Sequence, residues 1–142
     1  MQVDLPDVVA EVTEQFARYE KALVSNDVAV LDGLFRPDAR TLRYGIAENL
    51  YGYDAIMAFR AGRSPVGLMR RIDKTVITSY GRDMAVASTL FYRDSLPGKV
   101  GRQMQTWVRF PEGWKIVAAH VSIIDQPESS NGKSSKGPDQ KA

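Results

Sequence analysis

A few polar side chains fall where the sequence pattern predicts a protein interior, and these could do chemistry. Tyr19 belongs to an apolar helical stripe, and Arg43 shares one face of a predicted strand with Thr41. An inward arginine is costly unless it meets a carboxylate, and a phenol can donate a hydrogen bond. Together they favour binding of a small anion. Each also has a simpler explanation: Tyr19 as a core aromatic residue, and Arg43 as a surface residue if the strand has the opposite register.

The strands near the C-terminus supply further candidates. Gln103 and Gln105 share one face of a predicted strand, and simple alternation puts His120 and Ser122 on one face of the last strand with Ile116. Buried polar groups must be paired or have a function, so these four side chains are candidates for ligand binding. The alternatives are a solvated sheet face for the two glutamines and satisfied core positions for His120 and Ser122.

Basic residues also gather between the end of the third predicted helix and the next strand, namely Arg60, Arg63, Arg70 and Arg71. Most should be solvated, and Arg71 is the one that we assign to ligand binding. No Asp or Glu falls at a mid-strand position expected to point inward. The predicted interior therefore donates hydrogen bonds and is positive, which suits an anion better than proton abstraction by a carboxylate.

The composition excludes several functional classes. The absence of cysteine rules out thiolate zinc sites and thiol nucleophiles, and a single histidine cannot build a multi-histidine metal site, so we expect no metal or cofactor. The 19 basic and 17 acidic side chains give a net charge of +2, which argues against a nucleic-acid-binding protein. No apolar run approaches the roughly 20 residues that span a bilayer, and no signal peptide is recognisable. We therefore expect a cytoplasmic protein without membrane contact.

The elements that would position these side chains form one α+β domain over residues 1–126. Apolar spacing predicts three helices, the first from Pro6, a second after Asp27 and a third at about 53–63. Strands are expected at 39–44, 71–80, 84–93, 102–110 and 114–124. Helices followed by antiparallel strands predict a curved sheet wrapped into a cone. Residues 127–142 are polar, and we expect them to be a disordered tail.

Four segments resemble the AtzH-like family, which belongs to the nuclear-transport-factor-like, or SnoaL-like, superfamily of cone-shaped, cystatin-like α+β barrels. They are 43–52, 59–60, 101–107 and 113–122. The last of them, a Gly-Trp strand that ends in His-x-Ser, is shared across the superfamily and specifies only the fold. The Arg-Tyr-Gly to Glu-Asn-Leu segment and the Gly-Arg-Gln-x-Gln-Thr-Trp strand are more specific to the AtzH-like group.

The resemblance implies a homodimer and a role in cyanuric acid and s-triazine degradation, beside an amidase-signature hydrolase. The family's proposed reaction converts 1,3-dicarboxyurea to allophanate with loss of one N-carboxyl group. Its proposed catalytic pair, a helix tyrosine and a first-strand arginine, falls by motif on Tyr19 and Arg43. The expected ligand is then a small dianionic carboxylated urea. The expected binding residues are Arg71, Gln103, Gln105, His120 and Ser122.

Three other functions remain open. The protein could bind a small anion, or serve as a partner subunit of an amidase, without catalysis. It could be an oligomerisation module that uses the outer face of the sheet and has a filled interior. It could also be an isomerase or dehydratase acting on a polyketide-like substrate, although the missing inward carboxylate speaks against this.

Overall fold

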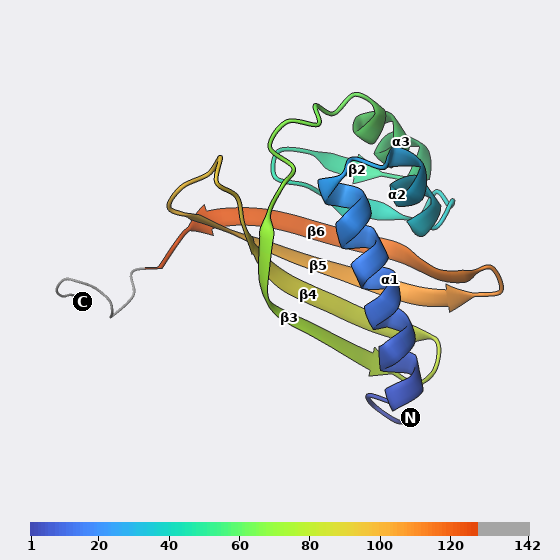
Figure 1. Cartoon of the computed structure of the whole chain (residues 1–142). Coiled ribbons are helices and arrows are strands. Elements are labelled where there is room, and N and C mark those ends of the chain that lie inside the picture. Colours follow the sequence, from blue (N-terminus) through green and yellow to red (C-terminus); the bar gives the residue numbers. More distant parts are fainter. Residues whose placement is uncertain (128–142) are drawn as a thin grey trace, which may run out of the picture.

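The first helix, α1 (Pro6–Val24), crosses one face of a curved sheet in the computed structural model, which describes residues 1–127 (Figure 1). The residues that it buries recur at three- and four-residue spacing and are Val8, Val12, Phe16, Tyr19, Ala22 and Leu23. Pro6 suits the first turn because its φ is already helical and its missing N–H would have no partner there. The helix therefore forms where the apolar stripe predicts it.

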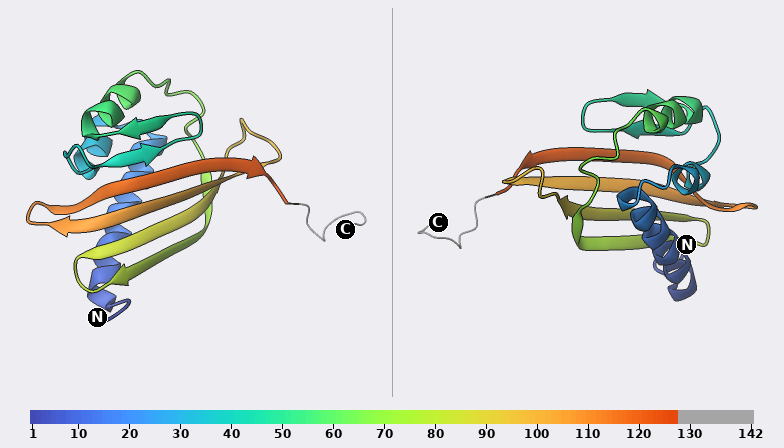
Figure 2. Two further views of the ribbon diagram at one scale, coloured as in Figure 1. Left: turned by 180° about the vertical axis from the view of Figure 1, so that it is seen from behind. Right: turned by 45° about the horizontal axis from the view of Figure 1, so that its top comes forward.

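Two shorter helices, α2 (Val28–Leu34) and α3 (Tyr53–Ala61), lie at one end of the sheet (Figures 1 and 2). Asp27 caps α2, because its side chain accepts a hydrogen bond of 3.2 Å from the backbone N–H of Val30. Gly52 precedes α3 with a φ of +92°, a conformation that favours glycine. Both helices confirm the elements predicted from the sequence.

The sheet has six strands in the order β2-β1-β6-β5-β4-β3. These strands are β1 (Leu42–Tyr44), β2 (Asn49–Tyr51), β3 (Arg71–Tyr80), β4 (Met84–Tyr92), β5 (Lys99–Phe110) and β6 (Gly113–Asp125). Its neighbours pair antiparallel except β1 and β6, which are parallel, so the sheet is mixed rather than antiparallel as expected. The sequence predicts no strand over the segment of β2. The α+β architecture is confirmed, with a curved sheet that does not close on itself (Figure 2).

A β-bulge interrupts the last strand. Thr106 pairs with Ala118, whereas the next residue, Trp107, pairs with Ile116, which leaves Val117 as an extra residue in β6. An extra residue reverses the alternation of side chains beyond it. Trp114 and Ile116 are buried before the bulge and Ala119 and Val121 after it. The expectation that one face of β6 runs unbroken from Ile116 to Ser122 is therefore wrong.

The core lies between α1 and the inner face of the sheet. Its largest fully buried side chains include Phe35, Leu31, Trp107 and Ile116. Among residues 1–127, no helix combines the length and the apolar character needed to cross a membrane. The predicted polar tail falls, from residue 128 onward, outside the residues that the structure describes.

Candidate functional site

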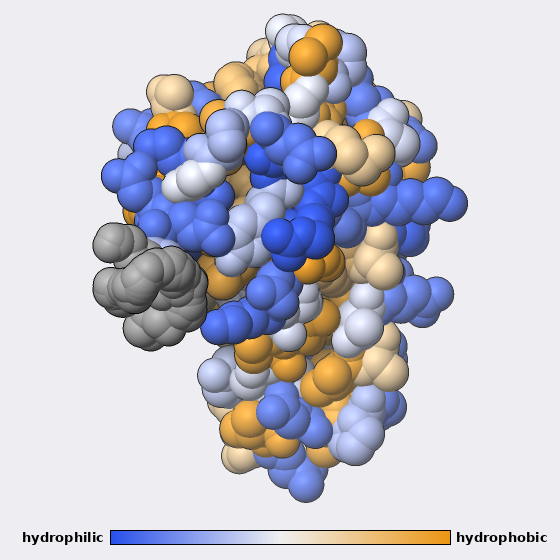
Figure 3. All heavy atoms as spheres, turned by 60° about the vertical axis from the view of Figure 1, so that its left-hand side comes forward, coloured by the Kyte–Doolittle hydropathy of each residue, from blue (hydrophilic) through white to orange (hydrophobic). Residues whose placement is uncertain are grey.

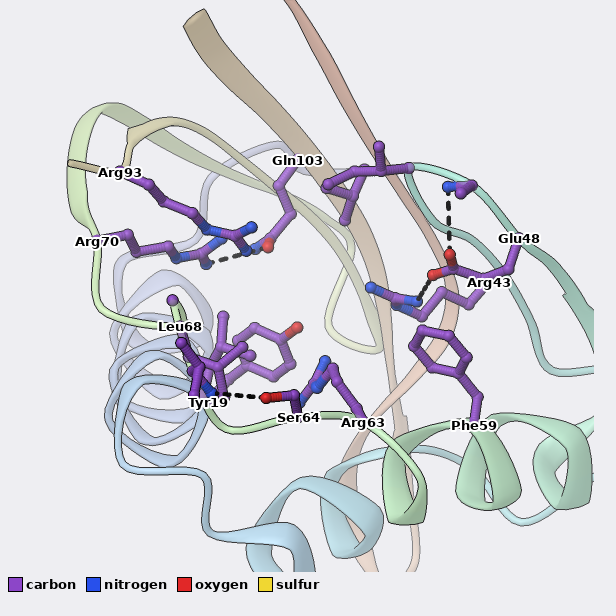
Figure 4. A pocket seen from close by; sticks show the side chains of 16 residues that line it. Tyr19, Arg43, Glu48, Phe59, Arg63, Ser64, Leu68, Arg70, Arg93 and Gln103 are labelled. Atoms are coloured by element: carbon purple, nitrogen blue, oxygen red, sulfur yellow. Dashed lines mark hydrogen bonds and ion pairs between the residues drawn. The ribbon is translucent and has the colours of Figure 1, made fainter. Parts of the chain in front are cut away.

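A cavity of about 310 Å³ opens where the C-terminal half of α1 faces the β1–β2 turn, α3 and the loop after it (Figure 4). This volume lies at the small end of the range of about 300–1,000 Å³ seen for small-molecule sites. Strongly hydrophilic side chains gather in the upper part of the face shown in Figure 3, at the end of the molecule that carries α2 and α3. The cavity contradicts an interior filled by side chains.

Tyr19 reaches the cavity from the buried stripe of α1. The residue is only 4% exposed, and its ring lies 6.4 Å from the ring of Phe35, measured between centroids. The aromatic body is thus part of the core, while the hydroxyl points into the cavity (Figure 4). Within residues 1–127 this hydroxyl has no hydrogen-bond partner, so it is available to a ligand.

Arg43 lies on β1 and points inward, as strand alternation predicts. Its side chain is 12% exposed, and its guanidinium lies across the cavity from Tyr19 (Figure 4). Nη1 donates a hydrogen bond of 2.9 Å to Oε2 of Glu48, a residue of the turn between β1 and β2. The backbone N–H of Ala47 also donates to the Glu48 carboxylate, at 3.2 Å. Arg43 is therefore held away from water by an internal counterion that the sequence did not reveal.

A second guanidinium, that of Arg70, is built into the opposite wall. Its Nε and Nη2 donate to the two carboxylate oxygens of Glu20 at 2.8 and 2.6 Å, and Nη2 also donates to Oε1 of Gln103 at 3.0 Å. The Arg70 side chain is 1% exposed and stacks over the Phe91 ring at 4.5 Å. A bidentate ion pair of this kind fixes the orientation of both side chains, so Arg70 and Glu20 form a rigid part of the cavity wall.

Two more arginines, Arg63 and Arg93, line the cavity and have no carboxylate partner among residues 1–127. Burial lowers the pKa of both guanidinium groups from their usual value, and neighbouring arginines act in the same direction. Nε and Nη2 of Arg63 and Nε of Arg93 are buried without a hydrogen-bond acceptor in the described part of the chain. These two side chains carry positive charge that the protein itself does not neutralise.

The balance of charge around the cavity follows from these pairs. The four guanidinium groups belong to Arg43, Arg63, Arg70 and Arg93. Two carboxylates, Glu48 and Glu20, pair with two of them and leave a net excess of two positive charges. The interior is positive, as the sequence suggests, although two carboxylates reach it from a turn and a helix rather than from strands. A ligand with two negative charges would neutralise it.

The two glutamines predicted for the site lie at different depths. Gln103 lines the cavity, and its Nε2 is buried without an acceptor in residues 1–127. Gln105 is 1% exposed and does not line the cavity; its Oε1 accepts a hydrogen bond of 3.1 Å from Nε1 of Trp107. Gln103 is therefore in place to contact a ligand, whereas Gln105 supports the core beneath it.

His120 and Ser122 were predicted to point into the site and do not. Both lie on the outer face of the sheet, because the bulge at Val117 reverses the alternation of β6. The His120 ring packs edge-on against Tyr44 at 5.9 Å, and the Ser122 hydroxyl accepts a hydrogen bond of 3.1 Å from Arg102. Their assignment to ligand binding is corrected.

Arg71 was also predicted to bind the ligand and lies elsewhere. It is exposed and stacks over the Tyr92 ring at 4.4 Å, outside the cavity. Its neighbour Arg70 takes the inward position instead. Arg93 could have been found from the sequence, because it continues the buried alternation of β4 beyond Thr89 and Phe91.

The arrangement of the described residues also bears on metal binding. Among residues 1–127, no three His, Asp or Glu side chains come close enough together to hold a metal ion. The side-chain hydrogen-bond donors that line the cavity are four guanidinium groups, the phenol of Tyr19, the primary amide of Gln103 and the hydroxyl of Ser64.

Comparison with known proteins identifies the fold and the family. The model of the AtzH-like family matches residues 1–127. A crystallised protein of unknown function from the DUF3225 family of Pectobacterium atrosepticum is 61% identical, with 87% of this chain and 95% of that chain covered and a TM-score of 0.84. A cystatin-like fold protein from Burkholderia xenovorans is 50% identical over 89% of this chain and 99% of that chain, with a TM-score of 0.86.

A more distant likeness bears on the fold alone. An NTF2-like protein with a cystatin-like fold from Novosphingobium aromaticivorans is 23% identical, covers 85% of this chain and 84% of its own, and has a TM-score of 0.67. None of the curated proteins searched matches the sequence.

Proposed function

The chain belongs to the AtzH-like family, and from this premise we propose that it removes one N-carboxyl group from 1,3-dicarboxyurea, or from a related carboxylated urea, to give allophanate. The observation that carries the proposal is the cavity itself, in which an unpaired phenol faces an arginine among two uncompensated positive charges. A planar dianion with a urea centre offers acceptors to each of these donors. The reaction would take place in the cytoplasm.

The chemistry requires one proton and no cofactor. The bond between nitrogen and the departing carboxyl carbon breaks, its electron pair stays on nitrogen, and carbon dioxide leaves as that nitrogen gains a proton. The Tyr19 hydroxyl is the proposed donor of this proton, because it is unpaired and a phenol gives up a proton more readily than the unpaired guanidinium groups of Arg63 and Arg93. The phenolate left behind would lie near Arg63 and Arg93 and would recover its proton from water.

Tyr19 has a second possible role that the same geometry serves. It could donate a hydrogen bond to the urea oxygen as negative charge develops there, a contribution of about 3 kcal/mol for one donor. Arg43 would hold a carboxylate through parallel N–H···O bonds, which guanidinium geometry favours. Both roles place the urea between Tyr19 and Arg43.

The test is the reaction itself. Purified protein is mixed with freshly generated 1,3-dicarboxyurea, and carbon dioxide and allophanate are measured against the spontaneous rate. We expect both products to form in equal amounts and faster than without protein. Saturable binding without faster product formation would instead favour a non-catalytic anion-binding protein or a partner subunit of an amidase. Allophanate still contains an amide bond, so an amidase-type hydrolase is the expected next enzyme.

A homodimer paired through the outer sheet face is part of the proposal. Val76, Ser88, Met104, His120 and Tyr44 occupy one row across five neighbouring strands. Val76 and Met104 are 56% and 55% exposed. Exposed apolar side chains grouped on one face are typical of a protein–protein interface.

A further inference from the structure

The cavity holds two kinds of arginine, and the difference between them points to the shape of the ligand. Arg43 pairs with Glu48 at 2.9 Å and Arg70 pairs with Glu20 at 2.6 Å. Arg63 and Arg93 line the same cavity, and neither has a carboxylate or a hydrogen-bond acceptor for its buried Nε in residues 1–127. The uncompensated positive charge is therefore concentrated on one pair of side chains.

These two side chains come from segments far apart in the sequence. Arg63 follows α3, and Arg93 follows β4. In Figure 4 the Arg93 guanidinium lies beside the Arg70 guanidinium and the Gln103 amide, on the opposite side of the cavity from Arg43, and Arg63 lies near Tyr19. Any bound molecule that contacts both Arg43 and Arg93 must extend across the cavity, past the Tyr19 hydroxyl.

Arg63 and Arg93 repel each other and their neighbours. Desolvation is the largest cause that lowers the pKa of each, and Arg43 lowers both further. Arginine nevertheless stays charged in proteins. A buried charge of this kind is stabilised only by an opposite charge or by water, and an anion satisfies both the charge and the orphaned N–H groups. Nε2 of Gln103 also has no acceptor in residues 1–127, and it belongs to the same cavity wall as Arg93.

We propose that Arg63 and Arg93 bind the second carboxylate of a two-ended dianion whose first carboxylate is bound by Arg43. This inference rests on the proposed function and assigns the residues that select the substrate class. A molecule with one carboxylate leaves one of the two excess positive charges uncompensated, whereas a short dicarboxylate neutralises both. The site therefore discriminates by the number of carboxylates, and Tyr19 lies beside the centre of the bound molecule.

The test compares two unreactive probes on the full chain by isothermal titration at one salt concentration. Glutarate has two terminal carboxylates separated by three carbons, as many atoms as in 1,3-dicarboxyurea, and butyrate lacks one of those carboxylates. We expect glutarate to bind at least tenfold more tightly than butyrate. Arg63→Gln and Arg93→Gln should each weaken glutarate binding at least tenfold and leave butyrate binding within twofold. Arg71→Gln, an exposed arginine outside the cavity, is the matched control and should change neither.

A second measurement avoids the variants, in case a substitution prevents folding. In the wild-type protein, the arginine Nε–H signals of Arg63 and Arg93 should shift on addition of glutarate and saturate with the calorimetric affinity, and that of Arg71 should not. Equal affinities for the two probes, no saturable binding of glutarate, or unshifted Arg63 and Arg93 signals would each overturn the inference.

The two proposals fail in different ways. Loss of discrimination between glutarate and butyrate, with carbon dioxide still released from 1,3-dicarboxyurea, rejects only the role of Arg63 and Arg93. Retained discrimination without any release of carbon dioxide rejects the proposed reaction and leaves the two-ended anion site in place.

Discussion

Arg43 and Glu48 meet inside the cavity, with Nη1 of the arginine 2.9 Å from Oε2 of the glutamate. The carboxylate comes from the turn that joins β1 and β2, and it occupies a position that a ligand carboxylate would otherwise take. Glu48 thus stabilises Arg43 in the empty protein and competes with the ligand for it. Binding must either displace this carboxylate or share the guanidinium with it.

Replacement of Glu48 by glutamine should therefore have opposite effects on stability and binding. We expect the free energy of unfolding to fall by about 1–3 kcal/mol without ligand, because a mostly buried charge loses its partner. We also expect glutarate to bind several-fold more tightly, because no internal carboxylate competes. Chemical denaturation and calorimetry measure the two effects. Glu112→Gln, which removes an exposed partner of Arg36, is the control; weaker glutarate binding in Glu48→Gln would contradict the competition.

Tyr19→Phe should fold normally and lose most activity. The substitution keeps the ring that packs near Phe35 and removes a hydroxyl that has no partner in residues 1–127. The free energy of unfolding should therefore change by less than about 1 kcal/mol. Loss of a proton donor should slow release of carbon dioxide by about 10² to 10⁴ times. Tyr44→Phe, on the outer face, should retain activity. An undiminished rate in Tyr19→Phe would remove both proposed roles of the hydroxyl.

Arg70 should matter for stability more than any other arginine of the cavity. Its side chain is 1% exposed and pairs with Glu20 through two hydrogen bonds. Arg70→Gln would leave the Glu20 carboxylate partly buried without its partner, which typically costs about 3–5 kcal/mol. Urea denaturation should show this loss, and Arg71→Gln should stay within about 0.5 kcal/mol of the wild type. Equal stability of the two variants would show that the pair contributes little.

Met104→Glu should weaken the proposed dimer. Met104 is 55% exposed at the middle of the outer face, and in a dimer paired through that face the substitution would bury one new carboxylate from each copy. We expect wild-type protein to sediment as a dimer and the variant as a monomer with unchanged circular dichroism. Lys74→Glu changes the charge of an exposed residue on the edge strand β3 and is the control. Wild-type protein that sediments as a monomer would contradict the proposal.

The helices and five of the six strands were predictable because their signals are local. The stripe of α1, the Asp27 cap and the alternation of β4 each follow from residues close together in the sequence. The parallel pairing of β1 with β6 was not predictable, because it joins Arg43 to Ala119. A strand of three residues with mostly exposed side chains carries little pattern of its own, which is why the sequence predicts no strand at β2.

The site was predictable only where its residues lie on elements with a clear local pattern. Tyr19, Arg43 and Gln103 lie on elements whose inward face is clear from periodicity, and all three line the cavity. Glu48 was missed because a turn residue has no predictable direction. His120 was misplaced because Val117, Ala118 and Ala119 are all small and apolar, so nothing in the sequence marks where the alternation changes.

The bulge in β6 also makes the strand tolerant of a change in length at one position. Deletion of Val117 would remove the extra residue and leave every later pair with β5 as it is, because Ala119, His120 and Val121 already lie opposite Gln105, Met104 and Gln103. A loss of three nucleotides at this codon would thus shorten the strand without turning His120 toward the cavity or Val121 away from it. The same loss at a codon beyond the bulge would shift the strand by one residue and exchange its two faces.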